Sequence, residues 1–446
     1  MTRRILSEQV SRVLGNRQLV WVGTRGVDIE SISDLPQLTS VVSVIGRYRN
    51  RSRFNALSLE ELSGSRVDLD TFDIDDEPRE THRVEFRRAL LRLLSQPSAV
   101  ITYRPSIMVS GVCFARQERC EYLGLFSGHQ AAFEHKPWVE TSLAAEGIPT
   151  LEWIYVADDD QMDVRQLLDK GPVVLRRSRT TGGVGLTQLS DSRQLGEVWP
   201  WQDEAYVSVA PYMVDGIPVN VGAVVWNDGV TLHPASVQLI GVPCLTDRPF
   251  GYCGNDFGLA SELGGKVLDR LDDYTRRIGS WLHRYGYRGA YGVDFLVSHD
   301  DVYFTEINPR LQGSTHLSSE VMTELDESGI VLEHLAALAG VGMPIGRGLR
   351  ELADMVPKWA HFVVHAPRDG INSSEVRTLL TEVTRLPGFL HVDTALEEPI
   401  VAERGAAVAR ITVTSGITDT GFSLRQPWQN AVAAWRNRTK NDVLVQ

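Results

Sequence analysis

The stretch that decides the fold is residues 292–310, which read GVDFLVSHDDVYFTEINPR. Apolar residues alternate on both sides of the turn at 298–301, which predicts two antiparallel strands. Such pairing would bring together Asp294, Glu306 and Asn308, and these two carboxylates and one amide suit a Mg²⁺ ion that keeps several waters. Arg310 adds a planar, permanently charged group that suits a phosphate or another oxyanion. The alternative is an ordinary hairpin with charged residues at its rim.

A second informative segment comes earlier, at residues 171–186, which read GPVVLRRSRTTGGVGL. A short apolar strand ends in Arg176 and Arg177, and a loop rich in glycine and hydroxyl residues follows it. Small residues in such a loop let backbone N–H groups approach phosphate oxygens closely. The loop is not a Walker A loop, because no Gly-Lys-Ser/Thr closes it, and it is not a Rossmann fingerprint. Taken alone, it is also compatible with a flexible hairpin.

Taken together and in this order, the two segments resemble the ATP-grasp superfamily. The resemblance extends to Lys136, which precedes a helix expected at 137–146 and the turn Gly147-Ile148-Pro149, and it covers residues 115–345. It implies an α/β (α+β) chain with an ATP-grasp fold that binds ATP and Mg²⁺. Two ions are expected, with Mn²⁺ as an alternative metal. Arg176 stands where the family usually has a second Lys, so the charge is kept while the shape of the group changes.

The resemblance also implies a set of site residues. Arg310 and Arg176 are expected to be catalytic, and Asp294, Glu306 and Asn308 are expected to hold the metal. The family commonly has a Glu where Ala210 stands, so adenine recognition would rest on backbone groups at 210–213. The full set expected to contact the nucleotide is Lys136, Arg176, Ser178, Thr180, Thr181, Gly182, Gly183, Gly185, Ala210, Tyr212, Met213 and Asn220.

Composition limits the classes of protein. A chain of 446 residues with 43% hydrophobic and 23% charged residues is expected to form two or three globular domains. Its net charge of −12 argues against a general binder of nucleic acids or of anionic membranes. No signal core follows the basic N-terminus and no apolar run is long enough to span a bilayer. Its four cysteines lack CxxC spacing, which favours reduced thiols in a cytoplasmic protein.

Three domains are predicted: an N-terminal pre-ATP-grasp α/β domain at 1–130, an ATP-grasp domain at 131–345 and a small C-terminal α+β domain at 350–446. The first is expected to have strands at 18–22, 41–45 and 99–102 and a helix at 84–94. The acidic run at 68–80 is interpreted as an exposed loop. The tail is expected to have strands at 359–364 and 406–414 and helices at 373–386 and 428–438.

The function that the resemblance implies is ATP-dependent ligation of a carboxylate to an amine through an acylphosphate, with release of ADP and phosphate. The chain looks most similar to ATP-grasp peptide ligases of the pheganomycin type, which implies antibiotic or other peptide natural-product biosynthesis. The expected partners are a small carboxylic acid and an amino acid or peptide; a homodimer is left open. The alternatives are a nucleotide-binding regulatory module without ligation and a carboxylating or phosphorylating ATP-grasp enzyme.

Overall fold

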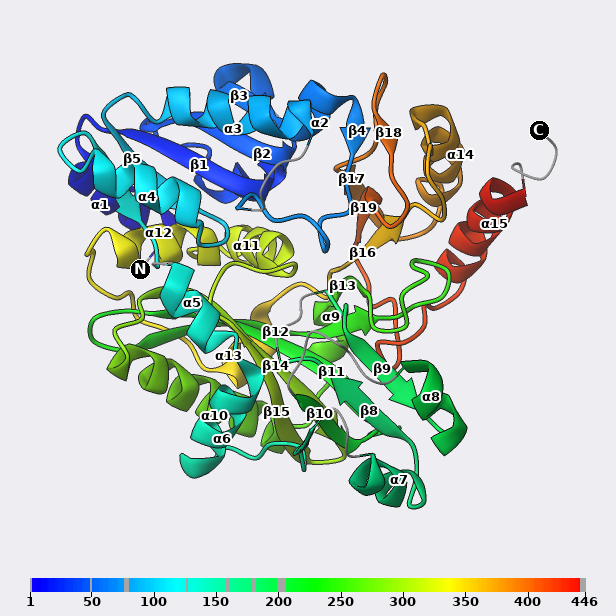
Figure 1. Cartoon of the computed structure of the whole chain (residues 1–446). Coiled ribbons are helices and arrows are strands. Elements are labelled where there is room, and N and C mark those ends of the chain that lie inside the picture. Colours follow the sequence, from blue (N-terminus) through cyan, green and yellow to red (C-terminus); the bar gives the residue numbers. More distant parts are fainter. Residues whose placement is uncertain are drawn as a thin grey trace.

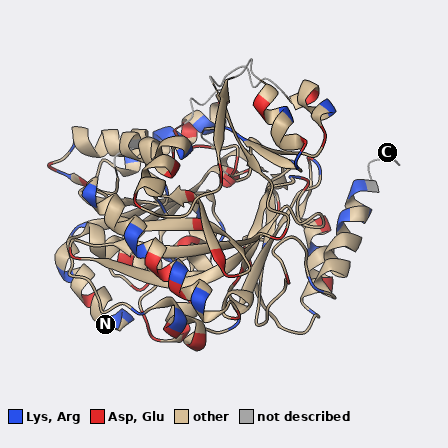
Figure 2. Ribbon diagram, turned by 90° about the horizontal axis from the view of Figure 1, so that it is seen from below, with Lys and Arg blue, Asp and Glu red and all other residues tan. Residues whose placement is uncertain are grey.

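The computed structural model describes residues 2–48, 50–75, 80–125, 127–157, 161–178, 182–198 and 206–441 (Figure 1). Within these ranges, no helix combines the length and the apolar character that crossing a bilayer requires. Basic and acidic residues are interspersed over the ribbon and do not gather in one basic region (Figure 2).

The N-terminal part contains a parallel sheet with the strand order β3-β2-β1-β5-β6. Its apolar strands are covered on both faces, as parallel sheets usually are, and separate buried clusters lie on the two faces. The strands are β1 (Gln18–Arg25), β2 (Leu38–Ile45), β3 (Asn55–Ser58), β5 (Ser98–Thr102) and β6 (Cys120–Leu123). The helices are α1 (Arg3–Leu14), η1 (Gly26–Ile32), η2 (Arg51–Arg53), α2 (Leu59–Ser63), α3 (Thr81–Leu93) and α4 (Ile107–Ala115).

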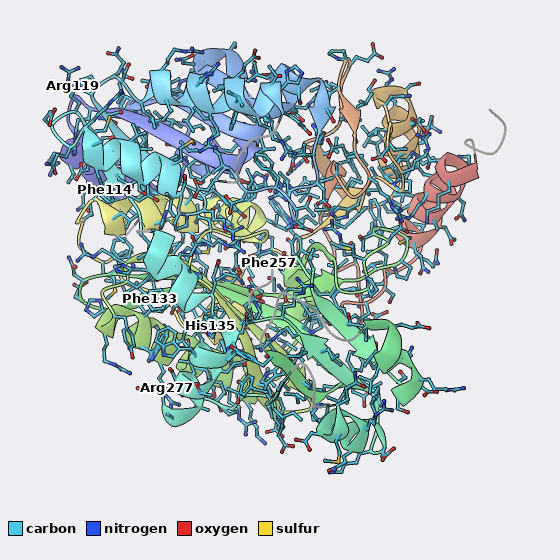
Figure 3. All side chains as sticks on the ribbon, viewed as in Figure 1. Phe114, Arg119, Phe133, His135, Phe257 and Arg277 are labelled. Atoms are coloured by element: carbon cyan, nitrogen blue, oxygen red, sulfur yellow. The ribbon has the colours of Figure 1, made fainter. Side chains whose placement is uncertain are left out.

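A connecting segment with two helices, α5 (Ser127–Phe133) and α6 (Lys136–Ala145), leads to a small antiparallel sheet. Phe133, at the end of α5, packs edge to face on Trp281, with ring centroids 5.7 Å apart. Figure 3 labels Phe133 and, just before α6, His135. The small sheet has the order β7-β10-β8-β9, and the glycine-rich loop joins β8 to β9. Its elements are β7 (Ile154–Ala157), α7 (Met162–Leu168), β8 (Val173–Arg176), β9 (Leu186–Leu189), η3 (Ser192–Gln194), α8 (Leu195–Val198) and β10 (Tyr206–Pro211).

The largest sheet has eight strands in the order β15-β14-β11-β12-β13-β16-β19-β17, and every neighbouring pair is antiparallel. Helix α10 buries its apolar face against this sheet in the largest core cluster. The strands are β11 (Ile217–Val225), β12 (Val230–Ile240), β13 (Tyr252–Asp256), β14 (Gly289–Ser298), β15 (Asp301–Asn308), β16 (Ala360–His365), β17 (Phe389–Asp393) and β19 (Ala407–Val413). The helices are α9 (Phe257–Ala260), α10 (Gly265–Arg284), α11 (Thr315–Glu324), α12 (Ile330–Leu338) and α13 (Leu349–Met355).

The C-terminal tail continues this sheet. Strand β16 pairs with β13, where Gly254 lies opposite Phe362. The two remaining helices, α14 (Ser373–Val383) and α15 (Trp428–Asn441), cover the added strands, and one buried cluster joins them to Leu239 and Cys253 of the central body. The tail also touches the N-terminal part, since β18 (Val401–Ala402) pairs with β4 (Ser65–Arg66). The predicted domain boundaries at 130, 345 and 350 stay a prediction. The pairing of β13 with β16 joins the tail after residue 350 to the sheet before it.

The interpretation of residues 68–80 as an exposed loop is wrong for the part that the structure describes at its start. Asp68 is only 7% exposed, and its carboxylate forms an ion pair with Arg248. Asp70 forms a second ion pair with the same guanidinium, at 2.7 Å. A partner that lies far away in the sequence therefore draws these acidic side chains inward. Residues 76–79 lie outside the described residues.

Candidate active site

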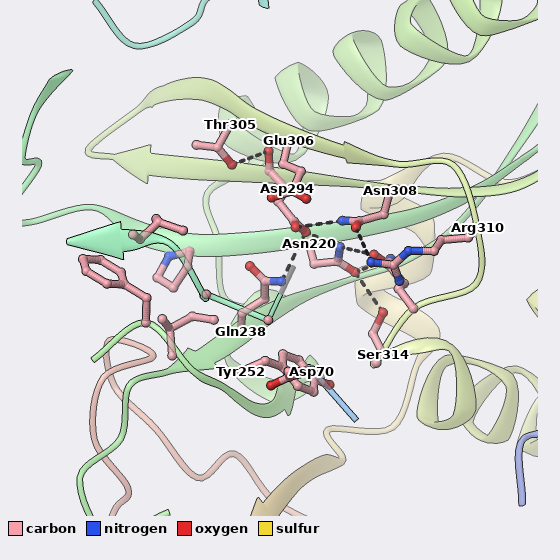
Figure 4. A pocket seen from close by; sticks show the side chains of 18 of the residues that line it. Asp70, Asn220, Gln238, Tyr252, Asp294, Thr305, Glu306, Asn308, Arg310 and Ser314 are labelled. Atoms are coloured by element: carbon pink, nitrogen blue, oxygen red, sulfur yellow. Dashed lines mark hydrogen bonds between the residues drawn. The ribbon is translucent and has the colours of Figure 1, made fainter. Parts of the chain in front are cut away.

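The predicted hairpin is present and brings the three proposed metal ligands together. In the register of β14 and β15, Asp294 lies opposite Glu306 and Gly292 lies opposite Asn308. A register shift just after Asp294 changes the pairing of the two strands at this point. The two carboxylates and the amide consequently gather on one wall of a cavity (Figure 4).

Asp294 is held by three amide groups. Its Oδ1 accepts hydrogen bonds from Asn220 at 2.6 Å and from Gln238 at 3.2 Å, and its Oδ2 accepts one from Asn308 at 3.0 Å. Burial raises the pKa of Asp294, and the nearby charge of Glu306 raises it further. Two carboxylates are thus forced close together where water is scarce, which disfavours their ionisation unless a cation lies between them.

The donor set fits a hard divalent cation such as Mg²⁺, because Asp294 and Glu306 lie opposite each other and a cation would offset the repulsion between their carboxylates. Asn308 fits less directly. Its Oδ1 accepts a hydrogen bond from Arg310 at 3.0 Å, and its amide nitrogen faces Asp294. As a ligand it would have to turn its amide and give up the contact with Arg310.

The two cations expected at the phosphates are both engaged by carboxylates. Lys136 is buried, with its Nζ 3.1 Å from Glu306 Oε1, and the described residues that line the cavity do not include it. Arg176 does line the cavity, but it forms a buried ion pair with Glu140 and lies 3.8 Å from the centre of the Trp153 ring. It also donates a hydrogen bond to the Thr305 carbonyl at 3.3 Å. These contacts hold Arg176 against the β14–β15 hairpin.

Arg310 reaches the cavity from the segment after β15. Its Nε donates to Glu134 at 3.3 Å, and its Nη1 donates to the Leu311 carbonyl at 3.2 Å. Burial alone would lower the pKa of Arg310, but the carboxylate of Glu134 together with Tyr103 and Glu306 raises it. The guanidinium is therefore a fixed positive charge beside the two proposed metal ligands.

The cavity has a volume of about 360 Å³ and draws its wall from every part of the chain. Its polar residues from the N-terminal part include Arg25, at the end of β1, Asp70, Tyr103 and Arg104. Burial raises the pKa of Asp70 to about 6. Gly182 and Gly183 come from the glycine-rich loop, and Phe422 comes from the tail. The site thus lies where the N-terminal sheet, the small sheet, the large sheet and the tail meet.

The described part of the glycine-rich loop is packed against the rest of the protein. Gly182, Gly183 and Gly185 have φ values of 59°, 77° and 80°, which favour glycine. A Cβ on Gly182 would lie 2.3 Å from Asp70 Cγ, and one on Gly183 would lie 1.9 Å from the Phe250 carbonyl oxygen. At the base of the loop the Ser178 carbonyl accepts a hydrogen bond from the Lys136 amide at 3.2 Å. Thr180 and Thr181 lie outside the described residues.

The predicted adenine segment is only partly on the cavity wall. Tyr212 and Met213 line the cavity, and the Tyr212 amide donates to the Pro172 carbonyl at 2.8 Å. Ala210 is fully buried in β10 and is not among the described residues that line the cavity. Asn220 lines it at a different place, because its amide binds Asp294 and exchanges hydrogen bonds with Gln312. The contacts of Asn220 therefore orient the carboxylate of Asp294.

Sequence reasoning missed several residues of this site. Gln312 and Ser314 complete the network around Asn220, and Glu140 with Trp153 fixes Arg176. No local pattern marks these partners. Arg25 could have been found, since it ends a strand of a parallel sheet, and ligands commonly bind outside the carboxyl ends of such strands.

Comparison with known proteins supports the fold. The family described as ATP-grasp domain matches residues 160–314. The carbamoyl phosphate synthase large chain of Thermus thermophilus is 27% identical over 230 residues, which are 50% of this chain, and the chain spans 21% of that relative's length. Among solved structures, the N5-carboxyaminoimidazole synthetase of Staphylococcus aureus, complexed with ADP, aligns with a TM-score of 0.58 and 14% identity over 97% of this chain and 96% of that chain. The biotin carboxylase of Campylobacter jejuni aligns with a TM-score of 0.60 and 13% identity over 90% of this chain and 87% of that chain.

These matches confirm the predicted ATP-grasp fold with its mixed α/β content. They correct the expected likeness to peptide ligases of the pheganomycin type, because the proteins compared above are a carbamoyl phosphate synthase, a carboxyaminoimidazole synthetase and a biotin carboxylase, and none of these is a peptide ligase. The motifs that carried the expectation mark the nucleotide-binding fold as a whole, and they contain nothing specific to a peptide acceptor. The role in antibiotic biosynthesis gains no support from them.

Proposed function

We propose, from the premise that this chain carries an ATP-grasp domain, that it is an ATP-dependent ligase. It would activate a carboxylate as an acylphosphate, pass the acyl group to an amine and release ADP and phosphate. The observation that carries the proposal is the meeting of Asp294 and Glu306 on the wall of a cavity that Arg310 also enters and that Gly182 and Gly183 border.

The nucleotide would lie along the cavity. Its adenine would contact Tyr212 and Met213, and its phosphates would lie between the glycine-rich loop and the β14–β15 hairpin. Asp294 and Glu306 would hold Mg²⁺, with Asn308 as a third ligand once its amide has turned. When bound, Mg²⁺ supplies positive charge that offsets the charge of the transferring phosphoryl group.

The side chains of the chain itself would do three things. Arg310 would stabilise the charge that grows on the reacting carboxylate and phosphoryl oxygens, because Glu134 already holds its guanidinium in place. Lys136 and Arg176 would act through their partners, by fixing Glu306 and the hairpin backbone. The glycine-rich loop would exclude water, which would otherwise hydrolyse an acylphosphate.

The acceptor would occupy the end of the cavity near the N-terminal sheet. Arg25 and Arg104 can attract a carboxylate there, and Asp70, whose pKa is about 6, can take a proton from an attacking amine. An amino acid or a short peptide carries both a carboxylate and an amine, so this class of acceptor fits the two features best. Its link to natural-product biosynthesis stays a prediction.

A second candidate is a carboxylating enzyme in which bicarbonate is the acid. It is favoured by the structural likeness to a carboxyaminoimidazole synthetase and to a biotin carboxylase. The test is to measure ADP release with ATP and Mg²⁺ in two arms, one with small carboxylic acids plus amino acids or dipeptides and one with bicarbonate alone. ADP release that needs an amine and yields a dehydrated product supports the ligase. Release with bicarbonate alone supports the carboxylating enzyme, and nucleotide binding without release in either arm supports a regulatory module.

A further inference from the structure

A second group of ionisable side chains lies outside the cavity, where the three parts of the chain meet. Glu30 comes from η1 in the N-terminal part, His316 and Glu320 come from α11, and Asp393 ends β17 in the tail. One potential ligand atom from each of Glu30, His316 and Glu320 lies within 4.8 Å of the other two. The reaction proposed above uses none of these four residues.

The distances around His316 are too long for hydrogen bonds and suit shared coordination. His316 is 4% exposed, and its Nε2 lies 3.8 Å from Glu320 Oε2 and 3.6 Å from Asp393 Oδ2. Within the part of the chain that the structure describes, none of these three buried atoms has a hydrogen-bond partner. Bonds of about 2.0–2.1 Å in tetrahedral geometry put two ligands of one metal roughly 3.4 Å apart. A metal ion therefore explains the spacing of His316 and Glu320 and the lack of a partner at their two facing atoms.

The other oxygen of each carboxylate is already held by a neighbour. His391 Nε2 lies 2.8 Å from Glu320 Oε1, and Arg410 Nε donates to Asp393 Oδ1 at 2.8 Å. These outer contacts orient the remaining oxygens toward His316, which is the arrangement that supports ligands in metal sites.

The charges also call for a cation. Four carboxylates lie in this region, those of Glu30, Glu320, Asp393 and the buried Asp28, and they face two guanidinium groups. Arg410 pairs with Asp393 and approaches Asp28 at 3.9 Å, and the charge of Arg25 also acts on Asp28. His316 is buried, and burial favours the neutral imidazole over the charged form. A neutral imidazole keeps a lone pair for a metal.

We propose that Glu30, His316 and Glu320 form a second metal site, with Asp393 beside it, for a first-row transition dication such as Zn²⁺. The imidazole ligand makes this site chemically different from the site at Asp294 and Glu306, whose ligands are all oxygens and suit Mg²⁺. The ion ties η1 to α11. Because α11 directly follows the segment that carries Arg310, Gln312 and Ser314, it also steadies that wall of the cavity.

The test uses the full chain, stripped with a chelator and then titrated with Zn²⁺ in excess Mg²⁺, which occupies the other site. We expect one Zn²⁺ per chain by elemental analysis after dialysis, a higher unfolding temperature and, with Co²⁺ as a probe, visible absorption that Zn²⁺ abolishes. His316→Gln and the isosteric Glu320→Gln should each weaken Zn²⁺ binding by at least 100-fold. Glu324→Gln, an exposed position on the same helix, is the matched control and should bind as the unaltered chain does.

Two results would overturn the proposal. One is a chain that retains no Zn²⁺ in excess Mg²⁺. The other is unchanged Zn²⁺ affinity in Glu320→Gln, which preserves the shape of the side chain and so gives an answer even where His316→Gln fails to fold. Asp294→Asn should leave Zn²⁺ binding intact, and loss of Zn²⁺ in that variant would place the ion at the Mg²⁺ site and refute a second one.

Discussion

Replacing Gly183 by alanine should prevent the glycine-rich loop from lying over the cavity as the structure shows it. The added Cβ would lie 1.9 Å from the Phe250 carbonyl oxygen, and ordinary contact begins at 3.4 Å, so the loop would have to withdraw by about 1.5 Å. A backbone carbonyl cannot swing aside as a flexible side chain can. Misplacement of this size at a reacting centre costs about 100-fold in rate, so kcat for ADP release should fall by that factor.

Gly340 is the matched control for this substitution. Its φ is also 77°, but a Cβ there would meet no atom within 4 Å, and it lies just after α12. Both alanine variants should lose about 1–3 kcal/mol of unfolding free energy from backbone strain, as measured by denaturant titration. Only Gly183→Ala should lose activity. A kcat within twofold of the unaltered chain, or an equal loss in Gly340→Ala, would refute the role of loop closure.

Three further substitutions test the remaining parts of the site. Glu306→Gln should abolish ADP release with the fold intact, because it removes a charge that would face the proposed Mg²⁺; full turnover at ordinary Mg²⁺ would contradict the metal assignment. Arg310→Lys keeps a charge but loses the planar group that spans Glu134 and Asn308, so kcat should fall more than KM for ATP rises. A change confined to KM would assign Arg310 to ground-state binding. Glu140→Gln leaves the buried Arg176 without its carboxylate and should lower the unfolding free energy by about 3 kcal/mol in a denaturant titration; no change would show that the ion pair adds nothing to stability.

The parts of the fold that the sequence predicted are those governed by local patterns. Alternating apolar residues specified β14 and β15, but the regular register that starts at the turn would place Asp294 opposite Thr305. The register shift just after Asp294, which no local pattern predicts, brings it opposite Glu306. Continuous apolar runs similarly marked β1 and β5 of the parallel sheet. Where a site is built on neighbouring strands, a short stretch of sequence is enough to indicate it.

The parts that the sequence did not predict depend on long-range partners. Arg176 was expected to meet phosphate and does line the cavity, but nothing in the sequence indicated that Glu140 of α6 pairs with it or that Trp153, before β7, packs on it. Asn220 was expected near adenine, but its position opposite Asp294 in the β11–β14 register gives it a carboxylate to orient. Neither partner lies within one helical turn or one hairpin of the residue it controls, so periodicity carries no signal for it.

The tail lines the cavity through Phe422, so we expect it to contribute to substrate binding, and the strand pairing decides how this is tested. Removing residues 350–446 would leave β13 as a bare edge and expose Leu239 and Cys253, which the tail now buries, so insoluble protein is the expected result. Phe422→Ala is the sharper test, because Phe422 lines the cavity from a loop and leaves the sheet pairing intact. It should raise KM for a substrate several-fold while the unfolding temperature stays close to that of the unaltered chain. An unchanged KM for every substrate, or a soluble truncated enzyme that keeps its acceptor KM, would show that the tail does not contribute to substrate binding.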